Sequence, residues 1–259
     1  MCDLSQAAAV KTQYATADRL STRISIHSKY STNKQGFGNW ICSHYQIESG
    51  MRVLELGCGT GEMWLGKEEL ISRCSSLVLS DFSEGMLKKA KETLGEKKNV
   101  TYQVIDIQSI PYSDHFFDAV IANMMLYHVP NLEKGLSEVR RALKPDGAFY
   151  CATYGENGMI ACVCDMFRDY GIQHQANKNF TLQNGDSILK QFFDSVQKYL
   201  YDDALAVTNV DDMTDYIFSL TGLSDLQKLP RETVRSVLEK NMADGVLWIP
   251  KEYGMFISK

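Results

Sequence analysis

The ten residues VLELGCGTGE at positions 53–62 constrain the fold of this chain more than any other segment. A short apolar strand ends on the acidic residue Glu55, and glycines follow at alternate positions, Gly57, Gly59 and Gly61. Glycine adopts backbone conformations that other residues avoid, so this turn can be sharp and can approach a ligand closely. The N–H groups that begin the next helix would suit an anionic group. A strand, a glycine-rich turn and a helix in this order indicate a ligand-binding α/β fold.

Short apolar runs alternate with helical stretches from Met51 to Tyr154, and this alternation predicts a parallel sheet with right-handed crossovers. The expected strands are VLEL, LVLSD, VTYQVID, FFDAVIA and AFYCATY. The expected helices are Met63 to Cys74, a helix capped by Ser83 that runs to about Leu94, and LEKGLSEVRRAL, which starts after Asn131 and ends at KPDG.

The flanking regions do not continue this alternation. Residues 1–50 have helical spacing and predict an N-terminal helical cap on the core at 51–154. Residues 155–245 predict a mostly helical insertion around one strand, QKYLYDDALAV, with surface helices at DDMTDYIFSL and RETVRSVLEKNM. The final residues, 246–259, predict a strand that returns to the edge of the core sheet. The expected fold class is therefore α/β, a Rossmann-like seven-stranded and mostly parallel sheet with helices on both faces, an N-terminal helical lid and a helical insertion before the last strand.

A glycine-rich turn after a strand is also the dinucleotide signature, and the spacing separates the two possibilities. The NAD pattern G-x-G-x-x-G would need a glycine at position 62, where this chain has Glu62 and instead places its third glycine at Gly61. Glu55 and Glu62 would also repel a pyrophosphate, whereas they would not repel the cationic amine and sulfonium of a methionyl ligand. We therefore treat a dehydrogenase as a weak alternative.

Two further acids stand at the ends of the next two strands. Asp81 follows LVLS, where a carboxylate can accept both hydroxyls of a ribose, and Asp106 ends the third strand, where one can accept the amino group of adenine. Phe82, Met86 and Ile107 flank these acids and are candidates to sandwich an adenine ring. Open α/β sheets bind ligands at the C-terminal ends of their strands, so the three acids together carry more weight than any one of them.

Residues 51–153 resemble the class I S-adenosylmethionine (SAM)-dependent methyltransferases, and most closely the ubiquinone/menaquinone-biosynthesis-like branch, methyltransferase type 11. The resemblance covers about 40% of the chain and rests on four segments: VLELGCGTG, LVLSDFSEGMLKKAK, VIDIQSIPYSDHFFDAVIANMMLYHV and LSEVRRALKPDGAF. It implies SAM as the cofactor and S-adenosylhomocysteine as its product. It also implies that Glu55, Gly57, Cys58, Gly59 and Gly61 hold the methionyl part, that Asp81 binds the ribose, and that Asp106 and Ile107 bind the adenine.

Methyl transfer needs alignment of the acceptor and exclusion of water, and an acceptor with an acidic proton also needs a base. His128, after the fourth strand, is the candidate base, with packing against the next helix as the alternative role. Tyr127 is a weaker candidate for the substrate side, and Asn123 is expected beside the methionyl group. Three residues of the N-terminal segment are candidates to close over the cofactor, or simply to form a solvated helix face: Tyr14, His27 and Tyr30.

Composition narrows the partners. The net charge of −5 and the absence of a basic stripe argue against nucleic acid as the main partner. The seven cysteines follow no zinc spacing, and no Asp, Asn and His cluster has ligand spacing, so we expect free thiols and no metal. No signal peptide or membrane span is apparent, which leads us to expect a cytoplasmic protein with no membrane partner. The oligomeric state is not indicated.

The leading hypothesis from the sequence is a methyltransferase that acts on a small-molecule acceptor. Two alternatives remain: an enzyme of the same fold that methylates RNA or protein, and a SAM-binding scaffold without catalytic activity. An intact glycine turn and its acids indicate binding, which does not by itself establish catalysis.

Overall fold

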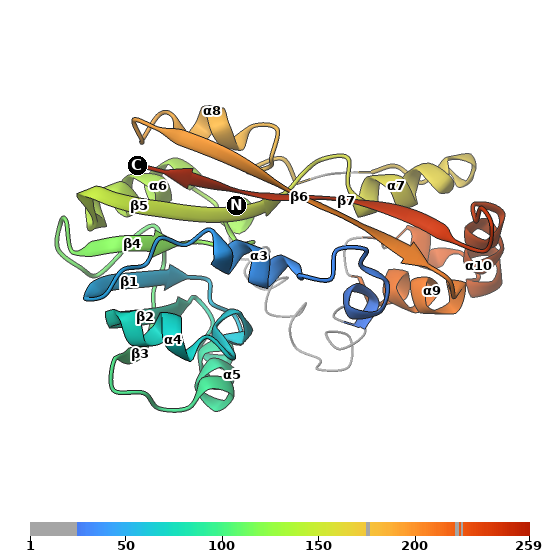
Figure 1. Ribbon diagram of the computed structural model, residues 1–259. Helices are drawn as coiled ribbons and strands as arrows, with labels where there is room; N and C mark the ends of the chain where they lie inside the picture. The colour runs from blue at the N-terminus through green and yellow to red at the C-terminus, as the bar shows by residue number, and fades with distance from the viewer. Residues whose placement is uncertain (1–24, 175–176, 221–222, 224) are drawn as a thin grey trace. The chain divides into compact units, whose positions relative to one another are not determined.

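The computed structural model describes residues 25–174, 177–220, 223 and 225–259, and a seven-stranded sheet runs through it (Figure 1). The strands are β1 (Met51–Leu56), β2 (Cys74–Asp81), β3 (Val100–Val104), β4 (Phe117–Ile121), β5 (Leu143–Tyr154), β6 (Val196–Val207) and β7 (Leu247–Ser258). Their order is β3-β2-β1-β4-β5-β7-β6, and the first five pair in parallel. The α/β, Rossmann-like and mostly parallel fold expected from the sequence is confirmed.

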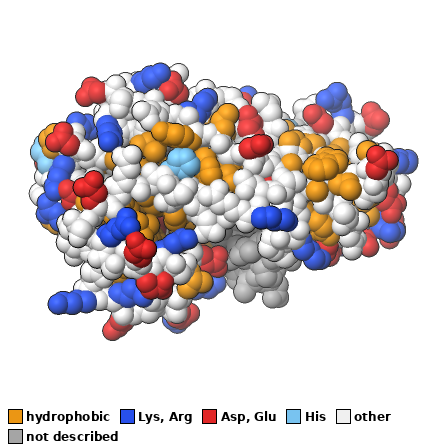
Figure 2. Space-filling view, viewed as in Figure 1, with side chains coloured by type: hydrophobic (Ala, Val, Ile, Leu, Met, Phe, Trp, Pro, Cys, Tyr) orange, Lys and Arg blue, Asp and Glu red, His pale blue; other side chains and the backbone are white. Residues whose placement is uncertain are grey.

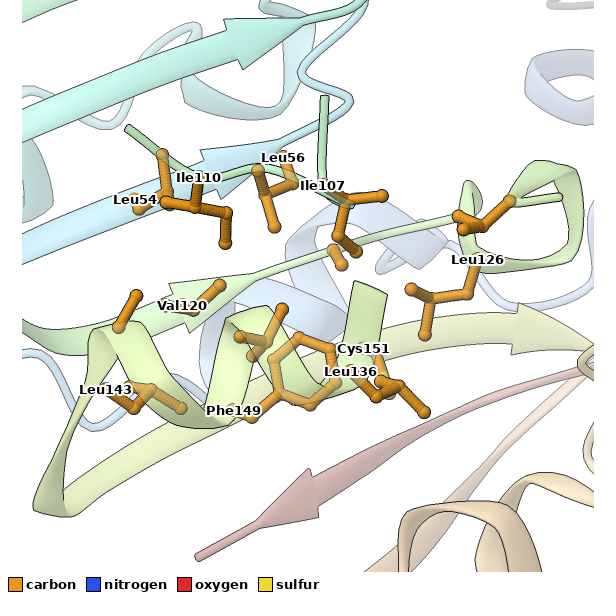
Figure 3. Packing of buried hydrophobic residues seen from close by; sticks show 14 of the residues in the cluster. Leu54, Leu56, Ile107, Ile110, Val120, Leu126, Leu136, Leu143, Phe149 and Cys151 are labelled. Atoms are coloured by element: carbon orange, nitrogen blue, oxygen red, sulfur yellow. The ribbon is translucent and has the colours of Figure 1, made fainter. Parts of the chain in front are cut away.

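Both faces of β1, β4 and β5 are buried, and the successive side chains of each of these strands point to opposite faces. In β1, Leu54 and Leu56 lie in one hydrophobic cluster and Val53 lies in the other. The first cluster, shown in Figure 3, also takes in Val120 of β4 and Leu136 of a covering helix. Strands buried on both faces read as continuous apolar runs, which is the pattern VLEL in the sequence.

Helices cover both faces of this part of the sheet. They are α3 (Phe37–Ser43), α4 (Glu68–Arg73), α5 (Glu84–Leu94), α6 (Leu132–Ala142) and α8 (Gly185–Leu189), with short 3-10 turns η1 (Glu62–Trp64) and η2 (Leu126–His128). Buried residues of α6 and α8 belong to the cluster with Leu54, whereas buried residues of α3, α4 and α5 belong to the cluster with Val53. The expected caps are confirmed, since Ser83 Oγ accepts the Met86 N–H and Asn131 Oδ1 accepts the Lys134 N–H.

The structure corrects three details. The expected helix from Met63 to Cys74 is divided into η1 and α4, because Gly66 interrupts it with a φ of 71°. KPDG lies within β5, where the pairing with β4 steps from Leu143 to Ala148 and leaves these residues as an irregularity. The last strand does not take the sheet edge: β7 lies between β5 and β6, so β6 is the edge strand.

The chain separates into two compact units by its internal contacts. The larger unit comprises residues 37–155, 177–201 and 254–259, and contains the sheet core and the helices above. The other comprises residues 1–36, 156–176 and 202–253, of which the structure describes the residues given above. Strands β6 and β7 each contribute one end to either unit. None of the helices among the described residues is long and apolar enough to span a membrane.

The second unit has its own hydrophobic core. Its helices and 3-10 turns are α7 (Met159–Met166), η3 (Arg168–Tyr170), α9 (Val210–Ser219), η4 (Leu226–Lys228) and α10 (Arg231–Lys240), and residues 25–30 are also helical. A buried ion pair joins β6 to β7, with Lys251 Nζ 2.5 Å from Asp203 Oδ2. Lys251 also donates to Ser31 Oγ, and Thr32 donates to Asp203, which fixes the segment after residue 30 on these strands.

Candidate functional site

Glycine is needed at the three positions of the turn after β1 for different structural reasons. All three have positive φ, at 71°, 56° and 77° for Gly57, Gly59 and Gly61. A Cβ on Gly57 would lie 2.9 Å from Met125, and one on Gly61 would lie 3.0 Å from Leu94, so these two make room for the protein's own packing. A Cβ on Gly59 would meet no atom of the described residues within 4 Å. Close approach to a ligand, expected for all three from the sequence, is therefore best supported at Gly59.

Asp81, the last residue of β2, is tied directly to this turn. Its Oδ2 accepts the Gly59 N–H at 3.0 Å and its Oδ1 accepts the Ser83 N–H at 2.8 Å. Burial raises the pKa of the Asp81 carboxyl above its ordinary value, while these two hydrogen bonds oppose the shift. Each carboxylate oxygen has a second lone pair, so the side chain can still accept hydrogen bonds from a ligand.

Glu55, the acid within the motif, is a buried carboxylate. Its Oε2 accepts the indole N–H of Trp64 at 2.6 Å, and the residue is 2% exposed. Burial raises its pKa to about 7; the Trp64 hydrogen bond opposes this shift and the nearby Asp81 charge adds to it. A buried carboxylate here favours a cationic partner over an anionic one. This agrees with the preference for a methionyl ligand over a pyrophosphate.

The raised pKa of Glu55 predicts a pH-dependent stability that Glu55→Gln removes. Because the folded-state pKa of about 7 exceeds the ordinary value of 4.5, the folded protein binds this proton more tightly than the unfolded chain does. The contribution is fully present below about pH 4.5 and is lost as the pH rises through about 7, by roughly 3 kcal/mol at most. Urea unfolding at about pH 5 and about pH 8 should show this loss in the wild type and not in the variant.

The control for that experiment is Glu133→Gln, which changes an exposed carboxylate at the start of α6. It should keep the wild-type pH dependence. If Glu55→Gln keeps it as well, Glu55 does not carry the proton.

The residues expected around an adenine ring differ in how open they are. Phe82 is 61% exposed and Met86 is half-buried in the first turn of α5, so both side chains are available to a ligand. Ile107 is 5% exposed, because its side chain packs in the core cluster of Figure 3, which leaves mainly its main chain for a ligand. Asp106 lies just beyond β3, and its Oδ1 accepts the Gln108 main-chain N–H at 2.8 Å. The roles of all four residues stay predictions.

Asn123 follows β4 at the edge of the sheet where the glycine turn follows β1. The last residue of β4, Ile121, is opposite Glu55 in the parallel pairing, so the two strands end at the same level. Asn123 Nδ2 donates to Tyr45 Oη at 2.6 Å, and its Oδ1 is buried without a hydrogen-bond partner among the described residues. Tyr45 comes from the segment after α3. An unpaired buried acceptor at this position fits a ligand that brings a donor.

The candidates of the methyl side lie in η2. The rings of Tyr127 and His128 are 4.4 Å apart, and Tyr127 also contacts Tyr154 at the end of β5, at 4.6 Å. The Tyr127 carbonyl accepts the Asn177 side-chain amide at 2.8 Å, which fixes η2 in place. Burial lowers the pKa of His128 below its ordinary value, so its imidazole is neutral at neutral pH.

Two candidate lid residues, His27 and Tyr30, contact side chains of the second unit. The His27 ring packs edge-on against Tyr216, and burial lowers its pKa to about 4, with the charge of Lys251 acting in the same direction. Tyr30 donates its hydroxyl to Asp212. These contacts tie both residues to α9, and their part in covering the cofactor stays a prediction. The third candidate, Tyr14, lies outside the described residues.

Cys58, expected from the resemblance to help hold the methionyl part, is buried within the turn. Burial raises the pKa of its thiol, and its N–H donates to the Ser80 carbonyl at 2.8 Å. Cys58 thus holds the turn against β2. Within the described ranges, no three His, Cys, Asp or Glu side chains are grouped as metal ligands.

Comparison with known proteins shows which family this part of the chain resembles. Residues 54–151 match the family described as methyltransferase domain. The chain is 34% identical over 104 residues to the ubiquinone/menaquinone biosynthesis C-methyltransferase UbiE of Yersinia pestis, a match that covers 39% of this chain and 41% of that protein. It is 30% identical over 134 residues to the demethylmenaquinone methyltransferase of Staphylococcus aureus, covering 52% and 54%. The matches thus span about half the length of these relatives, or less.

A solved structure extends the likeness of fold. The phosphoethanolamine N-methyltransferase 2 of Haemonchus contortus, in complex with phosphomonomethylethanolamine and S-adenosylhomocysteine, aligns with a TM-score of 0.58 at 19% identity, over 96% of this chain and 58% of that one. Residues 54–151 match a methyltransferase domain and are similar to the ubiquinone/menaquinone-biosynthesis branch of the class I methyltransferases, a class whose cofactor is SAM. The resemblance stated from the motifs is confirmed.

Two site residues were not selected from the sequence as functional. Trp64 is the partner of Glu55, and Tyr45 is the partner of Asn123. Tyr45 falls in the helical spacing that includes Phe37 and Trp40, and Trp64 closely follows the glycine turn. Spacing alone does not separate such residues from core aromatics.

Proposed function

We propose that the chain is a SAM-dependent methyltransferase that transfers a methyl group to a small-molecule acceptor. The observation that carries the proposal is the arrangement at the C-terminal ends of β1, β2 and β4. There the open Gly59, the Asp81 carboxylate and the unpaired Asn123 Oδ1 stand around one turn. The relatives named for quinone biosynthesis favour a small-molecule acceptor, but they match the cofactor domain and leave the acceptor unspecified.

The proposed cofactor contacts follow the polarity of each group. Asp81 accepts the two ribose hydroxyls, and Asp106 with the main chain of Ile107 receives the adenine amino group. Phe82 and Met86 cover the adenine ring with apolar surface. The buried carboxylate of Glu55 and Asn123 Oδ1 favour a positively charged methionyl amine.

His128 is the proposed base for an acceptor that carries an acidic proton. When bound, SAM supplies a methyl group on a positively charged sulfur. The leaving group is S-adenosylhomocysteine, whose sulfur is neutral. The chain's own task is to hold the acceptor in line and to exclude water. A neutral His128 can take a proton from the acceptor as the new bond forms, and Tyr127 and Tyr154 supply an aromatic wall beside it.

The base role predicts that His128→Gln lowers kcat by roughly a hundredfold or more, with an unchanged affinity for S-adenosylhomocysteine. Because the pKa of His128 lies below its ordinary value, the wild-type kcat should rise with pH, with the midpoint of the rise below about pH 6.5. The variant should lose this rising limb. An unchanged kcat would assign His128 to the pocket wall instead.

The test of the function is incubation of the protein with SAM that carries a labelled methyl group, together with a metabolite extract, RNA and protein. Label in a small molecule supports the proposal. Label in RNA or protein would favour the alternative, a methyltransferase of the same fold that acts on a macromolecule. On the face shown in Figure 2, basic and acidic side chains of the described residues are intermingled, and no purely basic surface for RNA stands out there. Binding of SAM without any labelled product would indicate a scaffold.

A further inference from the structure

The backbone next to Asn123 is strained. Met124, the next residue, has a φ of 53°, in the left-handed region that non-glycine residues seldom adopt. Its N–H donates to the Ala152 carbonyl of β5 at 2.8 Å, so the neighbouring strand fixes this conformation. Such conformations persist where surrounding structure imposes them, and they gather at ligand sites. The backbone on either side of Asn123 is thus held by β5, since the Ala122 N–H also donates to the Tyr150 carbonyl at 2.8 Å.

The Asn123 amide turns its donor end toward the Tyr45 hydroxyl. A side-chain amide has an acceptor end and a donor end of nearly equal size, and it can turn to present either. In this structure Nδ2 donates to Tyr45 Oη, and Oδ1 is the buried atom without a partner in the described part of the chain. The amide therefore presents an acceptor, whose natural partner is a ligand donor.

Tyr45 is itself fixed by aromatic contacts. Its ring is stacked at 6.5 Å on Trp64 and meets Tyr150 edge-on at 5.1 Å. Burial keeps the pKa of its phenol well above the ordinary value, so the group stays protonated and neutral. A neutral phenol oxygen can accept the amide hydrogen without adding a charge. Trp64 also binds the Glu55 carboxylate, so negative charge lies on the same side as Tyr45.

The acceptor and the charge specify the ligand group. Asn123 Oδ1 can accept a hydrogen bond from a ligand donor, and the Glu55 carboxylate favours a ligand with a positive charge. A primary ammonium meets both conditions. In the proposed cofactor only the amino-acid arm carries such a group.

We propose that Tyr45 is a positioning residue for the amino-acid arm of the cofactor. Its hydroxyl holds the Asn123 amide so that Oδ1 receives the ligand's ammonium group. This rests on the proposed function, because it assumes that SAM and S-adenosylhomocysteine bind at the turn after β1.

The test compares two ligands in calorimetric titrations of the full chain. S-adenosylhomocysteine has the amino-acid arm, whereas 5′-methylthioadenosine keeps the adenosine and the sulfur but lacks that arm. Tyr45→Phe should weaken binding of S-adenosylhomocysteine by roughly tenfold and change that of 5′-methylthioadenosine by less than about twofold. Tyr112→Phe is the control, since it removes a hydroxyl bound to Gln103 Oε1 away from the turn, and it should change neither affinity.

A second variant separates positioning from a general structural effect. If Tyr45 acts through Asn123, Tyr45→Phe should have no further effect on S-adenosylhomocysteine binding once Asn123→Ala is present. Asn123→Ala alone should show the same selective loss, which keeps the test decisive if Tyr45→Phe folds poorly.

Three results would overturn the inference: an equal loss for both ligands, no loss for either, or additive losses in the double variant. Wild-type protein that binds both ligands equally would overturn it as well, and would leave the proposed function intact. Wild-type protein that binds neither would contradict the proposed function, and the inference would fall with it.

Discussion

Asp81→Ala should weaken S-adenosylhomocysteine binding at least tenfold, which makes it one of the two largest effects expected. The variant removes hydrogen bonds from ligand hydroxyls to a charged acceptor, and each such bond contributes roughly 1.5–3 kcal/mol. It also removes the acceptor for the Gly59 N–H and the Ser83 N–H, so the turn keeps only its main-chain hydrogen bond from Cys58 to Ser80 of β2 among the bonds described above. Isothermal titration of both proteins measures the difference directly.

Asp81→Asn and Asp114→Ala complete this experiment. Asparagine keeps a single acceptor oxygen, so Asp81→Asn should retain part of the affinity that Asp81→Ala loses. Asp114 is an exposed partner of Arg141 at 2.9 Å, and its removal should leave the affinity unchanged. Wild-type affinity in Asp81→Ala would place the ligand elsewhere on the protein.

Gly59→Val is the second change for which we expect a large effect. The backbone at Gly59 has a φ of 56°, which a β-branched residue adopts only under strain, of order 1–3 kcal/mol. Among the described residues, no atom lies within 4 Å of the added Cβ, so the side chain would occupy the space through which a ligand approaches the turn. We expect a loss of stability together with loss of detectable S-adenosylhomocysteine binding in a calorimetric titration.

Gly50→Val separates these two causes. Gly50 has a φ of 89° and no described atom within 4 Å of an added Cβ, so the variant brings comparable backbone strain. Gly50 precedes β1, and the six residues of that strand place it about 20 Å from the glycine turn at the other end. It should lower the unfolding temperature and leave the affinity for the ligand unchanged. Equal loss of affinity in both glycine variants would mean that destabilisation alone explains Gly59→Val.

Local signals predicted the parts of the fold that local chemistry determines. Ser83 and Asn131 cap α5 and α6 because their side chains bond N–H groups three residues ahead, an arrangement contained within one turn of chain. The strands buried on both faces, such as β1, are recognisable as continuous apolar runs. The glycine turn was recognisable from its own residue types and from the apolar strand that precedes it.

The features that the sequence did not reveal depend on contacts between distant segments. The place of β7 between β5 and β6 is a choice of neighbours, which an alternating pattern does not encode. Gly57 is required by Met125, a residue 68 positions later, as much as by any ligand. Trp64 and Tyr45 gain their roles only when the sheet brings Glu55 and Asn123 beside them. From residue type and spacing alone, Trp64 and Tyr45 are recognisable only as aromatic residues of a core.

The measurement that tests the central claim most directly is a calorimetric titration of the full chain with S-adenosylhomocysteine and, separately, with NAD. The spacing of the glycines, the buried Glu55 and the acceptor on Asn123 all favour a ligand with a cationic amino-acid arm over a pyrophosphate. The predicted result is saturable binding of S-adenosylhomocysteine, with no comparable affinity for NAD. Preferential binding of NAD, or no binding of S-adenosylhomocysteine, would contradict the assignment of this site.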